Sequence, residues 1–103
     1  MKKNLIEDKK AKSKSFFLKR NKGIFDKSLL KFMISFFKKH KKDLRICLHK
    51  NSSSKHHDMI ILMQKKNFYI PHKHNKKGET YHMIYGKMCC VLFDSLGKIK
   101  KKF

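Results

Sequence analysis

Three residues with metal-binding side chains lie close together in the second half of the chain: His72, His74 and Glu79. In an extended strand, side chains two residues apart point to the same side, so both imidazoles would face one space. Residues 75–78 (NKKG) have the composition of a polar turn, and a hairpin there would return the Glu79 carboxylate to the imidazoles. Two imidazoles and one carboxylate form a facial ligand set that suits Fe, Mn, Ni or Zn. The alternative is a lysine- and histidine-rich hairpin that scatters these side chains into solvent, and spacing alone leaves both interpretations open.

Such a site has predictable chemistry. Imidazoles bind metals in their neutral form, so metal binding at His72 and His74 is expected to weaken below about pH 6.5. Open coordination positions would accept water or a substrate oxygen and allow Lewis-acid chemistry. These residues alone leave open whether the chain is an enzyme. The sequence contains no nucleophile elbow, phosphate-cradling loop or nucleotide-binding fingerprint.

Hydrophobic periodicity predicts the elements that must position these side chains. Apolar residues at helical spacing predict one amphipathic helix over residues 27–41, with Asp26 or Ser28 as its N-cap. Its apolar face would either pack on a sheet or lie on a membrane surface. From residue 44 the period changes to two and predicts short strands, over residues 44–49, 57–65, 68–74, 79–85 and 88–94.

Individual residues within these segments add predictions about burial, strand position and turns. The continuous apolar run at 59–63 predicts a strand buried on both faces, and Pro71 requires an edge position or a bulge. Residues 94–97 (DSLG) predict a hairpin turn. Short strands separated by regular turns are typical of an all-β sandwich or barrel. The predicted organisation is a mostly disordered basic arm over residues 1–23, with at most one strand or turn near Phe16, then a helical segment over 24–43 and a β domain over 44–103.

Length and charge limit the classes of protein. At 103 residues the chain forms one small domain at most. A formal net charge of +21 would attract nucleic acid or an anionic surface whatever the fold. Lysines are spread along the whole chain, however, and arginines are few, which also fits a general lysine bias. Three cysteines without framework spacing favour a reducing cytoplasm, and no apolar run is long enough to span a membrane.

The metal-binding stretch also resembles a known family. The first motif of the cupin superfamily, G-x5-H-x-H-x3,4-E-x6-G, falls on His72, His74, Glu79 and Gly86, with Lys66 in place of the leading glycine. The chain is similar to one branch, the WbuC-type cupin metalloproteins, from about residue 24 to 99. The matching motifs occur in the family's order, as R-x-x-L-H at 45–49, D-M at 58–59, Y-x-P-H-x-H at 69–74, E-x-x-H-x-x-x-G at 79–86 and F-D-x-x-G at 93–97.

This resemblance implies a mainly β fold: a cupin barrel (double-stranded β-helix, or jelly roll) preceded by one amphipathic helix. It implies one divalent transition metal on the three residues named above. His49 matches the family's L-H and could line the pocket, and a solvated histidine at the end of a strand is an equal alternative. Tyr69 and Tyr81 could supply hydroxyls there, although core packing is the commoner fate of tyrosines. The family is associated with surface-polysaccharide (O-antigen, lipopolysaccharide) biosynthesis, so the implied ligand is a small polar, sugar-related molecule.

One part of the family pattern is missing. Cupins carry a second motif, G-x5-P-x-G-x2-H-x3-N, whose histidine usually completes the metal site, but Pro71 is the only proline here and no histidine follows His82. The fourth ligand therefore cannot be assigned, and we expect a partial barrel with exposed strand edges that favour a homodimer. Two alternative functions remain: a non-catalytic cupin remnant or subunit, and a basic nucleic-acid-binding module.

Overall fold

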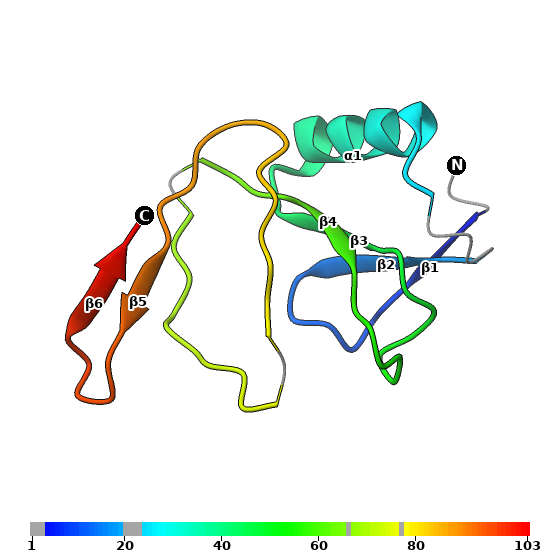
Figure 1. Cartoon of the computed structure of the whole chain (residues 1–103). Helices are drawn as coiled ribbons and strands as arrows, with labels where there is room; N and C mark the ends of the chain where they lie inside the picture. Colours follow the sequence, from blue (N-terminus) through cyan, green and yellow to red (C-terminus); the bar gives the residue numbers. More distant parts are fainter. Residues whose placement is uncertain (1–3, 20–23, 66, 77) are drawn as a thin grey trace. The chain divides into compact units, whose positions relative to one another are not determined.

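The computed structural model describes residues 4–19, 24–65, 67–76 and 78–103. The predicted end of the arm at Gly23, the lysine at 66 and part of the predicted turn at 75–78 lie outside these ranges. The chain divides into two compact units, Met1–Tyr69 and Ile70–Phe103, here called the first and second units. The elements in chain order are β1 Leu5–Glu7, β2 Lys14–Leu18, α1 Lys27–His40, β3 Leu44–Cys47, β4 Met59–Leu62, β5 Val91–Phe93 and β6 Ile99–Lys102 (Figure 1).

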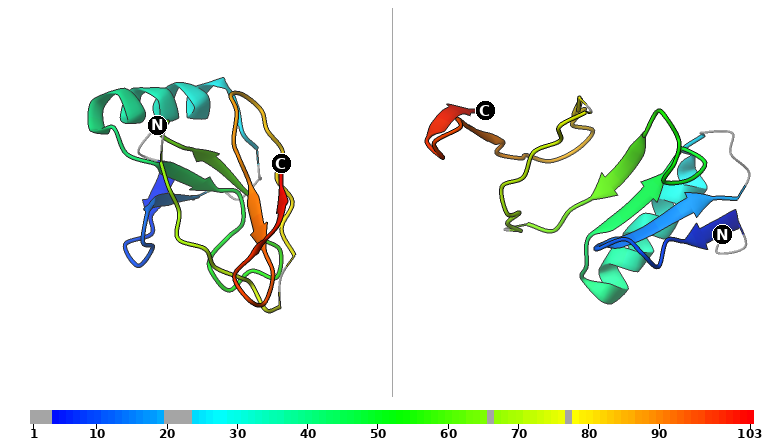
Figure 2. Two further views of the ribbon diagram at one scale, coloured as in Figure 1. Left: turned by 90° about the vertical axis from the view of Figure 1, so that its left-hand side faces the viewer. Right: turned by 90° about the horizontal axis from the view of Figure 1, so that it is seen from below.

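The first unit is a mixed four-stranded sheet with one helix across one of its faces (Figures 1 and 2). The strand order is β1-β2-β3-β4, with antiparallel β1/β2 and β3/β4 pairs and a parallel β2/β3 pair. A parallel pair requires a long crossover, and α1 supplies it between β2 and β3. The sequence did not predict this parallel pairing.

Helix α1 confirms the predicted helix almost to the residue. Asp26 is its N-cap, as one of the two predicted alternatives, and its carboxylate accepts a hydrogen bond from the Leu29 backbone N–H at 3.0 Å. Lys41 ends the helix in the left-handed conformation at φ 52°, and its N–H donates to the Phe37 carbonyl. Basic residues in the last turn interact favourably with the helix dipole.

The core of the first unit lies between α1 and the sheet. Leu29 and Met33 of the helix are buried in one cluster with Leu44 and Ile46, the two inward-facing residues of β3, both of which are 0% exposed. Alternate residues of a strand share a face, so two positions of a four-residue strand supply the centre of this core. Phe16 of β2 extends the cluster through edge-to-face contacts with Phe32 and Phe36 of the helix, at centroid distances of 5.8 and 6.3 Å.

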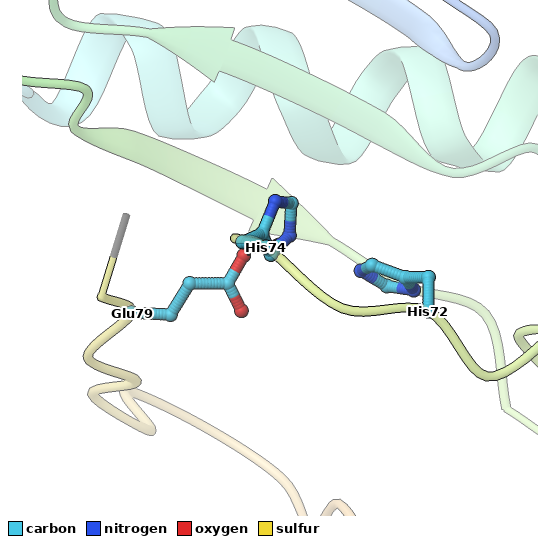
Figure 3. A group of neighbouring side chains, drawn as sticks. All are labelled: His72, His74 and Glu79. Carbon is cyan, nitrogen blue, oxygen red and sulfur yellow. Dashed lines mark ion pairs between the residues drawn. The ribbon is translucent and has the colours of Figure 1, made fainter. Parts of the chain in front are cut away.

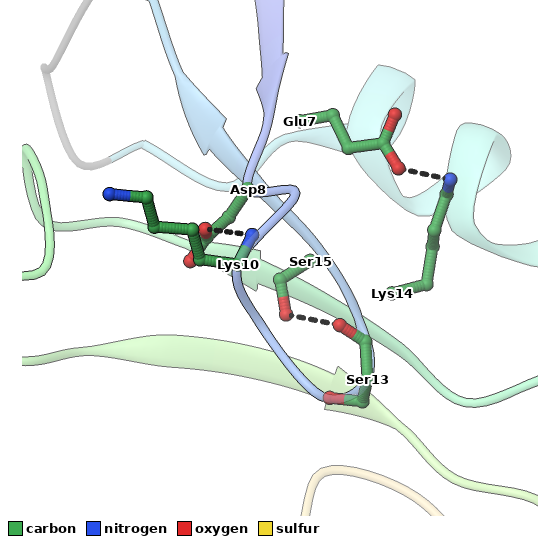
Figure 4. A network of polar contacts seen from close by, with 6 residues as sticks. All are labelled: Glu7, Asp8, Lys10, Ser13, Lys14 and Ser15. Atoms are coloured by element: carbon green, nitrogen blue, oxygen red, sulfur yellow. Dashed lines mark hydrogen bonds and ion pairs between the residues drawn. The ribbon is translucent and has the colours of Figure 1, made fainter.

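Residues 4–19 differ from the predicted disordered arm. The strand near Phe16 is present as β2, and β1 pairs with it antiparallel, matching Leu5 with Leu18. The lysine-rich composition of this segment predicted disorder. A few well-spaced apolar residues are nevertheless enough to form the two strands, because a helix and a third strand cover them. The connecting turn is held by local polar contacts: the Lys10 N–H donates to the Asp8 carboxylate, and the Ser15 hydroxyl donates to the Ser13 carbonyl (Figure 4).

The predicted β domain over 44–103 contains fewer strands than expected. The strands predicted at 68–74 and 79–85 are not formed, and those at 57–65 and 88–94 shrink to β4 and β5. Pro71 has no N–H to donate to a ladder, which disfavours the first of these strands. Strand β4 is half-buried rather than buried on both faces, because it is an outer strand of its sheet. The fold is mainly β, and the strands of the described residues do not close into a barrel.

The second unit contains an antiparallel hairpin, β5–β6, with a register shift between Leu92 and Phe93. The predicted turn joins its strands: the Asp94 carboxylate accepts from the Leu96 and Lys98 N–H groups, each at 2.9 Å. Gly97 adopts φ +81°, a conformation that L side chains rarely adopt. Within the ranges that the structure describes, no helix has the length and apolar character needed to cross a bilayer.

The core position of Ile46 generates a stability prediction. Ile46→Ala removes methyl groups from a fully buried site and is expected to lower the free energy of unfolding by about 2–5 kcal/mol. Leu30→Ala is the control, because Leu30 lies on the exposed side of α1 and is expected to cost less than about 1 kcal/mol. Urea denaturation followed by circular dichroism measures both. Equal losses for the two variants would show that β3 is not the centre of the core.

Candidate metal centre

The structure brings His72, His74 and Glu79 together in the second unit (Figure 3). One ligand atom from each lies within 4.8 Å of the others, and all three side chains are exposed. The closest contact joins His74 Nε2 to Glu79 Oε1 at 2.6 Å. The two imidazole rings are nearly perpendicular, with centroids 5.0 Å apart. Two nitrogen donors and one carboxylate thus converge on one small region of the surface.

Local contacts orient two of the three donors. His72 Nδ1 lies 3.3 Å from the Ile70 carbonyl, which can only accept, so this contact favours the tautomer of the neutral ring that has its proton on Nδ1 and its lone pair on Nε2. The Tyr81 hydroxyl donates to Glu79 Oε2 at 2.7 Å. That contact holds one carboxylate oxygen and leaves the other facing His74. Outer contacts of this kind fix ligand orientation in metal sites.

The backbone around these residues is irregular rather than a ladder of paired strands. Residues 67–74 and 78–84 have no assigned helix or strand, and a bend occurs at 75–76. The predicted return of the chain after His74 is therefore present without the flanking strands. Gly86, the last residue of the matched motif, lies in a second bend with φ +88°. A left-handed conformation there favours glycine over any residue with a Cβ.

His49, one of the predicted pocket residues, belongs to the first unit. It is buried just beyond the end of β3, where its Nδ1 lies 3.1 Å from the Asp58 N–H and 3.0 Å from the Asp58 carbonyl. Its ring stacks on that of His57, with centroids 4.2 Å apart, and meets Phe17 edge-on. Beside them, the Leu48 N–H donates to the Asp58 carbonyl at 2.8 Å. His49 therefore helps to hold the residues that follow β3 against those that precede β4, which is a structural role in this unit.

Tyr69, a second predicted pocket residue, lines a surface hollow of about 430 Å³ in the first unit. Its hydroxyl donates to Asp43 Oδ2, which also accepts from Asn67 Nδ2 at 2.7 Å. The other Asp43 oxygen accepts from the Gln64 N–H at 2.9 Å. Three lysines share the hollow, Lys12, Lys14 and Lys42, and Lys14 pairs with Glu7 (Figure 4).

Sequence reasoning missed two contributions. Asp43 joins residues more than twenty positions away, and no local pattern reveals such a contact. Tyr81 was predicted only as a possible pocket hydroxyl, whereas it holds the Glu79 carboxylate directly. The signal for that contact was present, because residues 79 and 81 are two apart and share a side in an extended backbone.

The sequence was compared with protein families, curated proteins and solved structures. A family model described as "Domain of unknown function (DUF6016)" matches residues 33–103. The chain belongs to this family. The DUF6016 region begins within α1 and includes β3 to β6 together with all three candidate ligands. No curated protein and no solved structure gives a significant match to the chain.

The contact of Tyr69 with Asp43 generates a pH prediction. Burial, and then the hydrogen bond to Asp43, raise the pKa of Tyr69 from 10.0 to about 12. The folded state therefore holds the phenol of Tyr69 in its neutral form more strongly than the unfolded state does. The resulting contribution to folding stability is fully present below pH 10 and is lost as the pH rises from 10 to 12. Ultraviolet titration should show a late phenolate component that disappears in Tyr69→Phe and moves toward pH 10 in Asp43→Ala. Unchanged late titration in Tyr69→Phe would contradict the assignment.

Proposed function

We propose that this DUF6016 protein binds one divalent transition metal ion, Fe, Mn, Ni or Zn, through His72, His74 and Glu79. The observation that carries the proposal is the approach of the three ligand atoms to within 4.8 Å of one another. Two imidazoles and one carboxylate are borderline donors that suit these ions. They leave coordination positions for water or a ligand.

The donor set fits such an ion. Metal–nitrogen and metal–oxygen distances of about 2.0–2.2 Å place neighbouring donors about 3 Å apart and opposite donors about 4 Å apart. The three donor atoms lie within 4.8 Å of one another, so ion binding would bring them closer together through movement of exposed side chains. His74 Nε2 and Glu79 Oε1 already face each other at 2.6 Å, and an ion bound by both atoms would take the place of this direct contact.

In this proposal, neighbouring groups orient two of the three donors. The Ile70 carbonyl would accept the proton of His72 Nδ1 and leave Nε2 to bind the ion. Tyr81 holds one oxygen of Glu79 and leaves the other to bind. A bound divalent ion would supply Lewis acidity toward a ligand oxygen. Exposure of all three donors gives a small polar molecule direct access to the open positions.

The ligand class in this proposal comes from the resemblance to WbuC-type cupins. Ordered motifs from 45 to 97 support a partial cupin domain with a small, sugar-related ligand in surface-polysaccharide biosynthesis. Analogy of this kind supports a ligand class and no specific reaction. A cytoplasmic location and a homodimer formed through the outer strands belong to the same proposal. All three cysteines are free thiols, which suits a reducing compartment.

Metal content tests the site. The full chain, stripped with a chelator, reloaded with Zn²⁺ or Mn²⁺ and desalted, is expected to retain about one ion per chain, because the described residues contain one three-donor group. His72→Ala and Glu79→Ala should each retain far less, because two donors bind weakly. His56→Ala is the matched control, since this exposed histidine lies outside the group. Retention that is equal in all four proteins, or absent from all of them, would refute the proposal.

The contact between Tyr81 and Glu79 generates a separate prediction. Tyr81→Phe removes the hydroxyl that holds Oε2 and should weaken metal affinity by about 10- to 100-fold while leaving the stoichiometry at saturation unchanged. Competition with a chromogenic chelator measures the affinity. Tyr85→Phe, which removes a hydroxyl from a 96% exposed tyrosine, is the control. An unchanged affinity in Tyr81→Phe would show that the hydroxyl does not position the carboxylate.

A further inference from the structure

Helix α1 carries two apolar stripes, and only one of them is covered. Leu29 and Met33 face the sheet and are buried. Leu30, Ile34 and Phe37 recur at spacings of four and three residues and therefore share a second face. Leu30 is 46% exposed, Ile34 is 41% exposed and Phe37 is half-buried. We call these three residues the outer stripe.

The core does not account for the outer stripe. None of its three residues belongs to the buried cluster of the first unit, as far as the described residues define it, or to the partly buried residues packed against that cluster. Helix formation does not require them either, because the capped ends and the buried stripe already stabilise α1. Leu30 and Ile34, with the half-buried Phe37 beside them, form a contiguous apolar patch on the outside of the helix, and such patches can mark interaction surfaces.

Positive charge borders the outer stripe. Lys27, Lys31 and Lys38 recur at spacings of four and seven residues and form a row beside it. Lys41 lies at its C-terminal end, with Nζ 5.9 Å from the Phe37 ring centroid. No acidic residue occurs between positions 27 and 42. The covering surface must therefore be apolar in its interior and negatively charged at its boundary.

We propose that the outer stripe of α1 docks on the surface of an anionic lipid bilayer. The apolar residues would enter the boundary between headgroups and acyl chains, and the lysine row would contact anionic headgroups. A nucleic acid could pair its phosphates with the lysines. Its phosphate exterior, however, provides little apolar surface against which the outer stripe could be buried. At 14 residues the helix is too short to span a bilayer, so it would lie in the plane of the interface.

Fluorescence separates insertion from simple adsorption. The chain contains no tryptophan, so Leu30→Trp introduces the only indole, at an exposed position that leaves the core intact. Phosphatidylserine-containing vesicles at physiological salt should shift its emission to the blue, because the indole enters an apolar environment. Phosphatidylcholine vesicles and duplex DNA should leave the emission unshifted.

A second tryptophan on the same helix provides the control. Ser35→Trp places the indole at another exposed site, about 140° around the helix from Leu30 at 3.6 residues per turn. Its emission should remain that of a solvated indole even when the protein sediments with anionic vesicles. Adding Ile34→Asn to Leu30→Trp should weaken partitioning into the vesicles about tenfold or more, because the apolar side chain that would enter the bilayer is replaced by a polar one.

Four results would overturn the proposal. Equal shifts for the two tryptophans, or sedimentation with no shift in Leu30→Trp, would show that the +21 charge adsorbs the chain without insertion. A larger shift with duplex DNA than with anionic vesicles would assign the face to nucleic acid. Emission in Leu30→Trp that moves to the blue with protein concentration, in the absence of vesicles, would show that a second copy of the chain covers the stripe.

Discussion

Burial of one short strand, β3, is the constraint on which the first unit depends. Its two inward residues, Leu44 and Ile46, are fully buried beneath α1, and β2 and β4 pair with its two edges. A chain of this length has no second large core to compensate for their loss. The polar contacts of this unit follow from the same strand. Asp43 precedes it and joins Gln64, Asn67 and Tyr69, whereas His49 follows it and joins Asp58.

The candidate metal centre depends on polar contacts rather than on apolar burial. Its three donors are exposed, and local contacts from Ile70 and Tyr81 orient two of them, His72 and Glu79, in place of a packed core. The net charge of +21 opposes any cation, and this repulsion acts over about 8–10 Å before salt screens it. Metal affinity at this site should therefore depend on ionic strength in the sense opposite to that of anion binding. All three donors belong to the second unit, and a bound ion would fix their positions where no packed core does so.

Periodicity predicted α1 and β3 because each buries one regular face, and that regularity is visible in the residues themselves. It failed at 68–74 and 79–85, where alternating residues can form a strand only if a partner lies alongside, and a single sequence does not reveal the partner. Composition failed at residues 4–19, where lysines outnumber the few apolar residues that decide the pairing. For the site, spacing predicted that His72, His74 and Glu79 would meet, and it did not predict the long-range contact between Asp43 and Tyr69.

X-ray absorption at the metal edge tests the central claim most directly, because it reports the atoms bound to the ion in the loaded full-length chain. The account predicts a first shell of nitrogen and oxygen at about 2.0–2.2 Å, with the multiple-scattering signature of two imidazoles. A sulfur shell at about 2.3 Å would place the ion on Cys89 or Cys90, the free thiols of the second unit, and would contradict the account. A first shell of oxygen alone would equally contradict it, because His72 and His74 would then have no part in binding.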